Sequence, residues 1–260
     1  MASYSQGNDS SYSPRLTWPE MDALFASEVN EFQSIHSGMH VAMLGTTRGG
    51  KTTLATGGGN PERGILRHWE DVLVLDTTGD PGAISQYGKP VNRFKGIHGH
   101  QRLTVGDMQP KSKELLHKWI QKAVNQGHVA IYVDELRQIT DAKYFGLGPV
   151  MDYLWLFCAK KDVSVIGGTQ APRWIPGAFY DQSKVHFIFH IRDDRSMKRL
   201  SEISGDTATM KTVIPNLARW EFAHVGLDGD VSTSKFELRK KPEKPPEKKI
   251  RVYRPASNSV

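Results

Sequence analysis

One stretch decides the fold of this chain: Gly45-Thr46-Thr47-Arg48-Gly49-Gly50-Lys51-Thr52-Thr53, entered from the apolar run His40–Leu44. It fits G-x-x-x-x-G-K-[ST], a pattern typical of a loop that holds the phosphates of a nucleoside triphosphate. Its glycines let the backbone turn closely around a polyphosphate with the N–H groups pointing inward. A glycine-rich turn could match by chance, but a strand before it and a helix after it favour the phosphate loop. We therefore expect residues 45–53 to bind ATP.

The last residues of the pattern predict specific contacts. The ammonium group of Lys51 is expected to face the β- and γ-phosphates, and the hydroxyl of Thr52 is the expected Mg²⁺ ligand. A helix beginning near Lys51 would add the positive end of its dipole. The expected ligands are therefore ATP and Mg²⁺.

Length and composition set limits on the class of protein. The chain has 260 residues, of which 38% are hydrophobic and 24% charged, so it can bury one sizeable core. No apolar run approaches the roughly 18 residues of a membrane span, so no membrane insertion is expected. The single cysteine, Cys158, lies in an apolar run and is expected in the core of a cytoplasmic protein.

The positive charge belongs to the C-terminal end. Eight Lys and Arg stand against two Glu in residues 239–260, which accounts for the whole net charge of +6. Several prolines interrupt this stretch, so we expect an extended, flexible tail. It would either contact nucleic acid or an acidic partner, or only keep the protein in solution. The expected division is an N-terminal extension with a short helix (1–37), an ATPase domain with a C-terminal hairpin (38–238) and the basic tail (239–260).

Apolar runs alternate with amphipathic stretches along residues 38–238. This alternation predicts an α/β fold with a mainly parallel central sheet and helices on both faces. A capping box at Thr17 and Glu20 predicts the start of the N-terminal helix. The expected helices are 112–126, 147–161 and 195–203, the expected strands are 40–44, 71–75, 129–133, 163–166 and 185–191, and a hairpin is expected from 219–225 and 231–238. Residues 86–101 show little pattern.

Polar residues follow two of these strands, and parallel strands meet ligands at their carboxyl ends. Asp134, after the strand 129–133, could hold Mg²⁺ opposite Thr52, and Glu135 could activate the attacking water as a general base. Gln170, after the strand that begins at Val163, could contact the γ-phosphate or the water and sense hydrolysis. The simpler interpretations are a solvated strand end for the two acids and a strand cap for Gln170.

Four stretches together resemble the HerA/FtsK superfamily of P-loop ATPases, which includes viral and phage genome-packaging ATPases. They are the phosphate loop, Asp76-Thr-Thr-Gly-Asp80, Val133-Asp-Glu135 and Gly168-Thr-Gln-Ala-Pro172-x-x-Ile-Pro176. The resemblance covers about residues 38–225 and implies a RecA-like core with an additional strand and a catalytic glutamate. It further implies a homo-oligomeric ring that moves double-stranded DNA with ATP. The compact chain favours the packaging branch, which would place the protein in the host cytoplasm, docked on a portal or capsid protein.

The resemblance also implies a cationic finger supplied by the neighbouring subunit. The family usually carries an arginine on the helix before the sensor strand, where this chain has Lys160 and Lys161. Lysine would act there as a point charge without the fork of arginine. Arg173 is a further candidate, as are Arg137, Arg192 and Arg195, and a solvated helix end is the simpler interpretation of the lysine pair.

Double-stranded DNA is gripped through phosphates by basic groups on a flexible backbone. The basic, patternless stretch 89–102 is the candidate, with contacts expected from Arg93, Lys95, His98, His100 and Arg102. An ordinary basic surface loop is the simpler interpretation.

Three other functions remain open. A conjugation or partition translocase would use the same site with other partners. A small-molecule kinase could use residues 76–80 at its acceptor site, although a kinase needs no glutamate that activates water. The third is a nucleotide-binding scaffold without hydrolysis.

Overall fold

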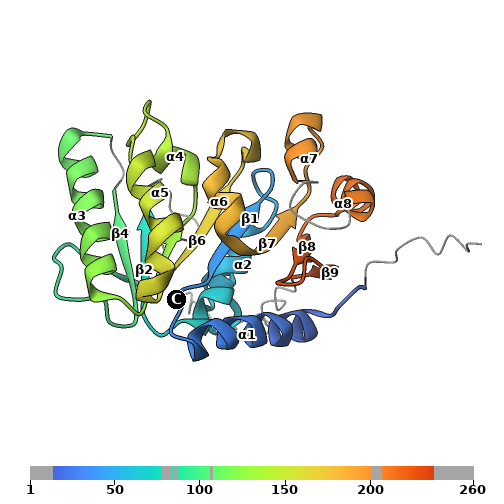
Figure 1. The fold of residues 1–260 in the computed structure, drawn as a ribbon, viewed down its shortest axis with the longest axis horizontal. Coiled ribbons are helices and arrows are strands. Elements are labelled where there is room, and N and C mark those ends of the chain that lie inside the picture. Colours follow the sequence, from blue (N-terminus) through green and yellow to red (C-terminus); the bar gives the residue numbers. More distant parts are fainter. Residues whose placement is uncertain (1–13, 78–83, 85–86, 106–107, 201–206, 237–260) are drawn as a thin grey trace, which may run out of the picture.

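Within the described residues, strands form a single nine-stranded sheet in the order β3-β4-β2-β5-β6-β1-β7-β8-β9 (Figure 1). The computed structural model describes residues 14–77, 84, 87–105, 108–200 and 207–236. The strands are β1 His40–Leu44, β2 Val72–Asp76, β3 Lys89–Pro90, β4 His100–Thr104, β5 Val129–Val133, β6 Val163–Thr169, β7 Ser183–Phe189, β8 Glu221–Val225 and β9 Val231–Lys235.

Strands β1 to β7 run parallel to one another wherever they pair, whereas β8 pairs antiparallel with both β7 and β9. The strand β6 lies between β1 and β5. Because these three strands are parallel, the residues that follow them meet at one edge of the sheet. The additional strand between the phosphate-loop strand and the acidic strand is therefore present.

Helices cover both faces of the sheet (Figure 1). One cluster of buried side chains lies between one face of the sheet and helices α1 and α2. A second cluster lies between the other face and the remaining α-helices. The α-helices are α1 Trp18–Ser34, α2 Lys51–Thr56, α3 Pro110–Gln126, α4 Leu136–Thr140, α5 Gly148–Phe157, α6 Gly177–Gln182, α7 Asp194–Leu200 and α8 Thr207–Val213. Short 3₁₀ turns lie at Gly57–Gly59, Pro61–Arg63, Ile65–His68, Cys158–Lys161, Pro172–Trp174 and Ile214–Asn216. The mainly parallel sheet with helices on both faces is as expected.

The N-terminal helix α1 begins at the capping box and packs into the core. The Glu20 carboxylate accepts hydrogen bonds from the backbone N–H and the hydroxyl of Thr17, at 2.8 and 2.7 Å. Met21, Phe25 and Val29, spaced at helical intervals, are buried in the same cluster as β1. Helix α1 therefore completes one face of the sheet.

Several expected elements have different limits. Residues 86–101 are not a patternless loop throughout, because β3 and the beginning of β4 fall within them. Both strands are short, and the exposed or half-buried residues of β4 hid its alternation. The helix expected at 147–161 ends as an α-helix at Phe157. Helices α4, α6 and α8 were not expected; they span only five to seven residues, too few for a periodic signal.

Some predictions lie outside the described residues: the basic tail, the end of the hairpin at 237–238, residues 201–203 of the expected helix and Thr78-Gly79-Asp80. In the described part of the chain, none of the helices combines the length and apolar character needed to cross a membrane. Cys158 is buried, as expected, and so are Trp69, Trp119 and Trp155.

Candidate active site

The phosphate loop leaves β1 and enters α2 through backbone conformations that favour glycine. Gly45 and Gly50 have φ of +148° and +123°. A Cβ on Gly45 would lie 2.6 Å from the Cβ of Phe189, the last residue of β7. The loop is therefore packed so closely on the end of β7 that a side chain at Gly45 would force them apart. Arg48 is exposed and also has positive φ, +62°.

Lys51, the first residue of α2, is folded back onto the loop. Its ammonium group donates to the carbonyl oxygens of Gly45 and Thr46, at 2.6 and 3.0 Å. The side chain is only 6% exposed, and burial lowers the pKa of Lys51 to about 8, against the opposing effect of the Asp134 and Glu135 carboxylates. The charge that would face the phosphates is therefore positioned by the loop's own backbone.

Thr52 and Asp134 are brought into direct contact from α2 and the end of β5. The Thr52 hydroxyl donates to Asp134 Oδ1 at 2.7 Å, and the Tyr132 hydroxyl donates to the same oxygen at 2.5 Å. Hydroxyl and carboxylate oxygens are the donors that Mg²⁺ prefers. The two residues assigned to the metal from the sequence thus form a donor set that fits Mg²⁺.

Glu135 points toward the end of β6. Its carboxylate accepts hydrogen bonds from the Thr169 hydroxyl at 3.1 Å and from the backbone N–H groups of Gln170 and Arg137 at 3.2 and 3.3 Å. Burial nevertheless raises the pKa of Glu135 above its ordinary value; these hydrogen bonds and the Lys51 charge oppose the rise. A carboxylate with a raised pKa is a stronger base than one in water.

Gln170 connects the third strand end to the phosphate loop. Its side-chain oxygen accepts a hydrogen bond from the Thr47 hydroxyl, and its backbone N–H holds Glu135. One exposed residue thus contacts both the loop and the acid. A change in the loop can therefore reach Glu135 through the side chain and the backbone of this single residue.

Two glycines in β6 allow the acidic strand to come this close. A Cβ on Gly168 would lie 2.4 Å from the carbonyl oxygen of Asp134, and one on Gly167 would lie 2.5 Å from Leu136 Cδ1. At Gly168 the close atom belongs to the backbone, so a larger residue would require the backbone to shift, whereas at Gly167 the close atom is the end of the Leu136 side chain.

Comparison with known proteins supports this architecture. No protein-family model matches the chain, and no curated protein matches it by sequence. The genome packaging NTPase B204 from Sulfolobus turreted icosahedral virus 2, solved with AMPPCP, superposes with a TM-score of 0.61 at 13% identity, over 77% of this chain and 98% of that one. B204 from Sulfolobus turreted icosahedral virus, described as a DNA-packaging ATPase, gives 0.59 at 16% identity, over 76% and 97%. Two ATPase units of EccC from Thermomonospora curvata give 0.54 at 10% identity, over 78% and 37%.

The chain has the mostly parallel α/β fold of a P-loop NTPase, like these solved structures. The fold inferred from the sequence motifs is therefore confirmed.

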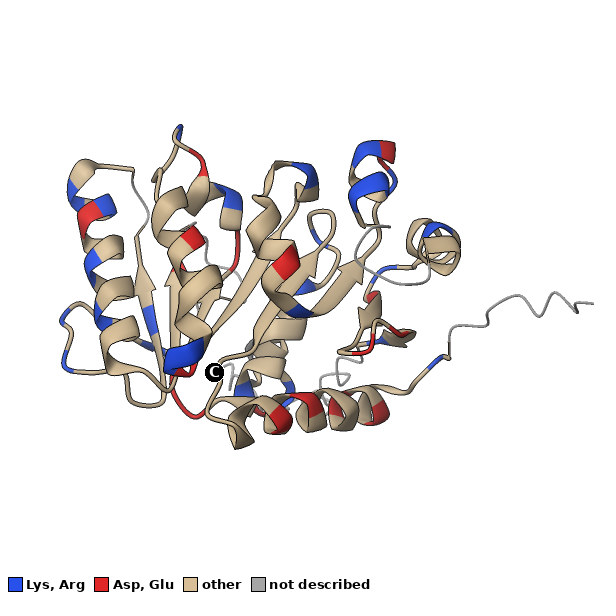
Figure 2. Ribbon diagram, in the orientation of Figure 1, with Lys and Arg blue, Asp and Glu red and all other residues tan. Residues whose placement is uncertain are grey.

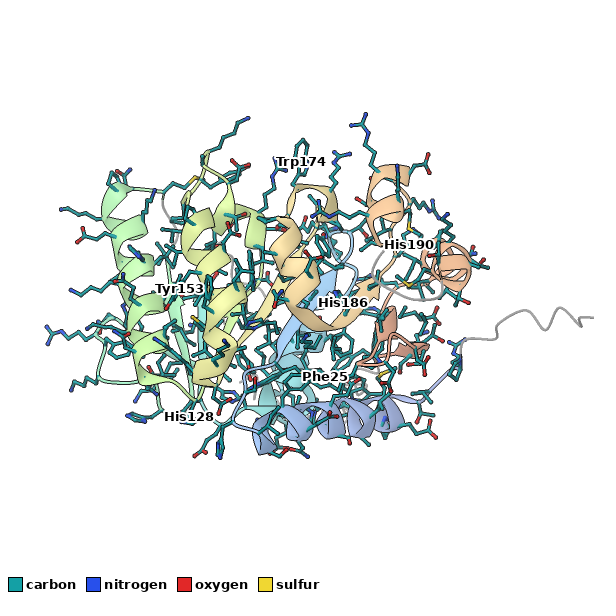
Figure 3. The ribbon with its side chains drawn as sticks, in the orientation of Figure 1. Phe25, His128, Tyr153, Trp174, His186 and His190 are labelled. Atoms are coloured by element: carbon teal, nitrogen blue, oxygen red, sulfur yellow. The ribbon has the colours of Figure 1, made fainter. Side chains whose placement is uncertain are left out.

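The finger candidates lie at opposite edges of this P-loop ATPase fold. Lys160 and Lys161 precede β6, whose seven residues span about 20 Å, so they lie far from Glu135 of the same subunit. Arg173 follows Gln170 by three residues and is exposed, 3.9 Å from Asp193. Figure 3 shows the adjacent Trp174 at the edge where the parallel strands end, and His128, the residue before β5, at the opposite edge.

The other arginines lie at the same edge as Arg173. Arg137 and Arg173 both lie over the ring of the exposed Trp174, at 5.6 and 5.3 Å from its centroid. Arg192 and Arg195, after β7, are exposed.

The DNA-contact candidates divide into two groups. Arg93, Lys95 and His98 are exposed between β3 and β4. His100 and Arg102 lie in β4 and not in a flexible loop, so the expected loop does not extend to them; whether they contact DNA stays a prediction. His100 contacts the Tyr87 hydroxyl at 2.6 Å and the Trp69 carbonyl at 2.9 Å, and Arg102 donates to the carbonyls of Ile84 and Tyr87 at 3.1 and 3.2 Å. Both side chains hold the sheet edge together.

Three contacts of the site were not expected from the sequence. Tyr132 holds Asp134, Thr169 holds Glu135, and the ring of Trp220 lies against Gly50. Tyr132, the polar-tipped residue of an otherwise aliphatic strand, was the only one whose context could have suggested a role. The other two depend on which strands become neighbours.

Proposed function

We propose that this protein is an ATP-hydrolysing motor that translocates double-stranded DNA, of the viral or phage genome-packaging kind. The observation that carries the proposal is the meeting of three strand ends: Lys51 and Thr52 after β1, Asp134 and Glu135 after β5, and Gln170 after β6. A site that only binds or transfers a phosphoryl group needs no glutamate between the loop and the sensor residue. The likeness over 98% of a packaging NTPase chain supports the same choice.

In the proposed reaction the loop and Lys51 hold the phosphates of ATP. Mg²⁺, when bound through Thr52 and Asp134, would neutralise charge on the β- and γ-phosphates. Glu135 accepts a proton from water as the water oxygen attacks the γ-phosphorus, and the bond to the β-phosphate oxygen breaks to leave ADP and phosphate. The raised pKa of Glu135 suits this role because the ionised carboxylate is then more basic. Thr47 and Gln170 would report loss of the γ-phosphate to β6.

The proposed DNA contact is the basic surface formed by the loop 91–99 and α3. The loop is fastened to the end of α3, because Gln126 exchanges two hydrogen bonds of 2.8 Å with the backbone of Ile97. Lys111, Lys113, Lys118 and Lys122 lie on α3, whereas α1 carries four acidic residues and no Lys or Arg (Figure 2). A one-sided charge distribution of this kind attracts the phosphate backbone to one part of the molecule.

Further parts of the proposal concern partners. We propose a homo-oligomeric ring in which a cation from one subunit, with Arg173, Lys160 and Lys161 as candidates, reaches the site of the next. The ring would work in the host cytoplasm, docked on a portal or capsid protein. The basic tail at 239–260 would be a docking arm or a DNA contact.

The test is steady-state ATP hydrolysis with and without linear double-stranded DNA, beside the Glu135→Gln variant. We expect DNA to stimulate wild-type hydrolysis, and the variant to lose about 10²- to 10⁴-fold in kcat because it cannot accept the proton. The variant should still bind ATP, which equilibrium binding would check.

Other outcomes lead to other functions. Hydrolysis that does not respond to DNA would contradict translocation. A Glu135→Gln variant with wild-type activity would indicate that the glutamate is not the base. Phosphoryl transfer to a small acceptor in preference to water would indicate a kinase.

A further inference from the structure

Trp220 stands apart from the other tryptophans of the chain. Of the six tryptophans, four are buried, and Trp174 is exposed at 58%. Trp220 is half-buried and lies against the phosphate loop: a Cβ on Gly50 would meet its Cε3 at 2.9 Å and its Cζ3 at 3.4 Å. An aromatic ring with part of its surface in solvent thus forms one wall of the site.

The backbone at Trp220 is strained. Its φ is +72°, in a region where a bulky side chain is unfavourable and glycine is usual. The residue is third in a turn closed by a 3.1 Å hydrogen bond from the Glu221 N–H to the Ala218 carbonyl. Strain of this kind persists where the surroundings hold it, and it often marks a functional position.

The surroundings of Trp220 hold the turn firmly. The Glu221 carboxylate accepts from the Ala218 N–H at 2.9 Å and pairs with Arg15 at 2.6 Å. The Phe236 N–H donates to the Trp220 carbonyl at 3.0 Å. The ring is therefore kept beside Gly50 by β8, β9 and the N-terminal segment together.

The order of the strands fixes which part of a nucleotide would reach this ring. Glu135 and Gln170, which must face the γ-phosphate, follow β5 and β6 on one side of β1. The strands β7 and β8 lie on the other side of β1, and Trp220 immediately precedes β8. A triphosphate with its terminal phosphate toward Glu135 therefore directs its nucleoside toward β8.

We infer that Trp220 is the base-stacking platform of the nucleotide site, with Arg219 closing over the base. This inference rests on the proposed nucleotide site. Arg219 is exposed, and its guanidinium lies 4.9 Å from the centroid of the Trp220 ring. A purine inserted between the two planar groups would be contacted on both faces. Because stacking uses the face of the base and not its edge, the platform accepts adenine and guanine alike.

The test separates base recognition from phosphate recognition. Binding of ATP, GTP and inorganic tripolyphosphate, each with Mg²⁺, is measured by titration calorimetry on the full chain. The main variant is Trp220→Gly, because glycine removes the ring and also suits the positive φ, so the turn keeps its conformation. Trp220→Phe keeps an aromatic face, and Trp174→Ala removes an exposed tryptophan elsewhere at the same edge.

We expect Trp220→Gly to bind ATP and GTP about tenfold to hundredfold more weakly, since stacking of one base contributes that much. Its affinity for tripolyphosphate should stay within about twofold of wild type. Trp220→Phe should recover most of the loss, and Trp174→Ala should bind all three ligands as wild type does.

Two results would overturn the platform. Equal losses for ATP and tripolyphosphate would mean that the ring only supports the loop, and unchanged ATP affinity would mean that the base lies elsewhere. Wild-type protein that binds neither ligand would refute the nucleotide site itself. Normal ATP binding without DNA-stimulated hydrolysis would count against the motor and leave the platform standing.

Discussion

At the residue scale, the chemistry of the site depends on two ionisable side chains, Lys51 and Glu135, that are shielded from solvent. Lys51 and Glu135 have pKa values shifted toward each other, the lysine downward to about 8 and the glutamate upward, and burial is the main cause of both shifts. For each group, the charged form is therefore less favoured than it would be in water. Phosphate binding and proton transfer both depend on this arrangement.

Lys51 predicts a pH dependence of nucleotide binding. Its pKa of about 8 in the free protein should rise when phosphates approach, so binding takes up protons above pH 8. Affinity for Mg²⁺-ATP should be fully present below pH 8 and fall as the pH rises above it.

The measurement is titration calorimetry at pH 6.5 and at pH 9, in buffers of different ionisation enthalpy. We expect uptake of about one proton at pH 9 and little at pH 6.5. The Lys51→Ala variant should lose the uptake together with affinity. Binding at pH 9 without proton uptake would show that Lys51 is fully protonated before ATP arrives.

At the scale of elements, the site depends on how closely β5 and β6 approach each other. Gly168 has no room for a side chain because a Cβ there would lie only 2.4 Å from the carbonyl oxygen of Asp134. The same short separation lets Glu135 reach Thr169 and Gln170. Stability and catalytic geometry are therefore linked at this strand pair.

Gly168→Ala should destabilise the protein and reduce hydrolysis together. The added methyl must push the ends of β5 and β6 apart, which costs about 1–3 kcal/mol and moves Asp134 and Glu135 from their partners. Urea denaturation and steady-state hydrolysis measure the two effects.

Gly177→Ala is the matched control, because a Cβ there has its nearest neighbour at 3.8 Å. It should leave the free energy of unfolding within about 0.5 kcal/mol of wild type. A Gly168→Ala variant as stable and active as this control would disprove the close approach.

At the scale of the whole molecule, the proposed ring requires a cation that crosses between subunits. Arg173 is the strongest candidate: it is exposed at the same edge as Glu135, and its pair with Asp193 is long, at 3.9 Å. Its charge is available to a neighbouring chain. Lys160 and Lys161 precede β6 and lie at the opposite edge of the sheet from Glu135. They could act only if the active site of the neighbouring subunit lay against that opposite edge.

Mixing two inactive proteins tests the crossing cation. Glu135→Gln lacks the base and Arg173→Ala lacks the finger, yet a mixed ring contains sites that combine Glu135 of one subunit with Arg173 of the other. We expect the mixture to recover hydrolysis that neither variant shows alone.

The parallel mixture with a Lys160→Ala, Lys161→Ala double variant is the comparison. Recovery there, and not with Arg173→Ala, would assign the finger to the lysine pair. Recovery in neither mixture would exclude both candidates as groups acting between subunits.

The sequence by itself determined the parts of this protein that depend on local spacing. The phosphate-loop pattern at 45–53 indicated a nucleotide site. The apolar runs ending at Leu44, Val133 and Ile166 indicated parallel strands, with Asp134, Glu135 and Gln170 after them. The resulting fold is confirmed. These features can be recognised from the sequence because backbone conformation and burial repeat with a fixed period along the chain.

Only the tertiary structure decided which residues became neighbours. The placing of β6 between β1 and β5 brought Thr169 to Glu135, and the placing of β8 beyond β7 brought Trp220 to Gly50. It also placed His100 and Arg102 in β4, although the sequence had suggested that they belong to a flexible loop that contacts DNA. Such contacts join residues far apart along the chain, and no local pattern encodes them, because they follow from the packing of whole strands.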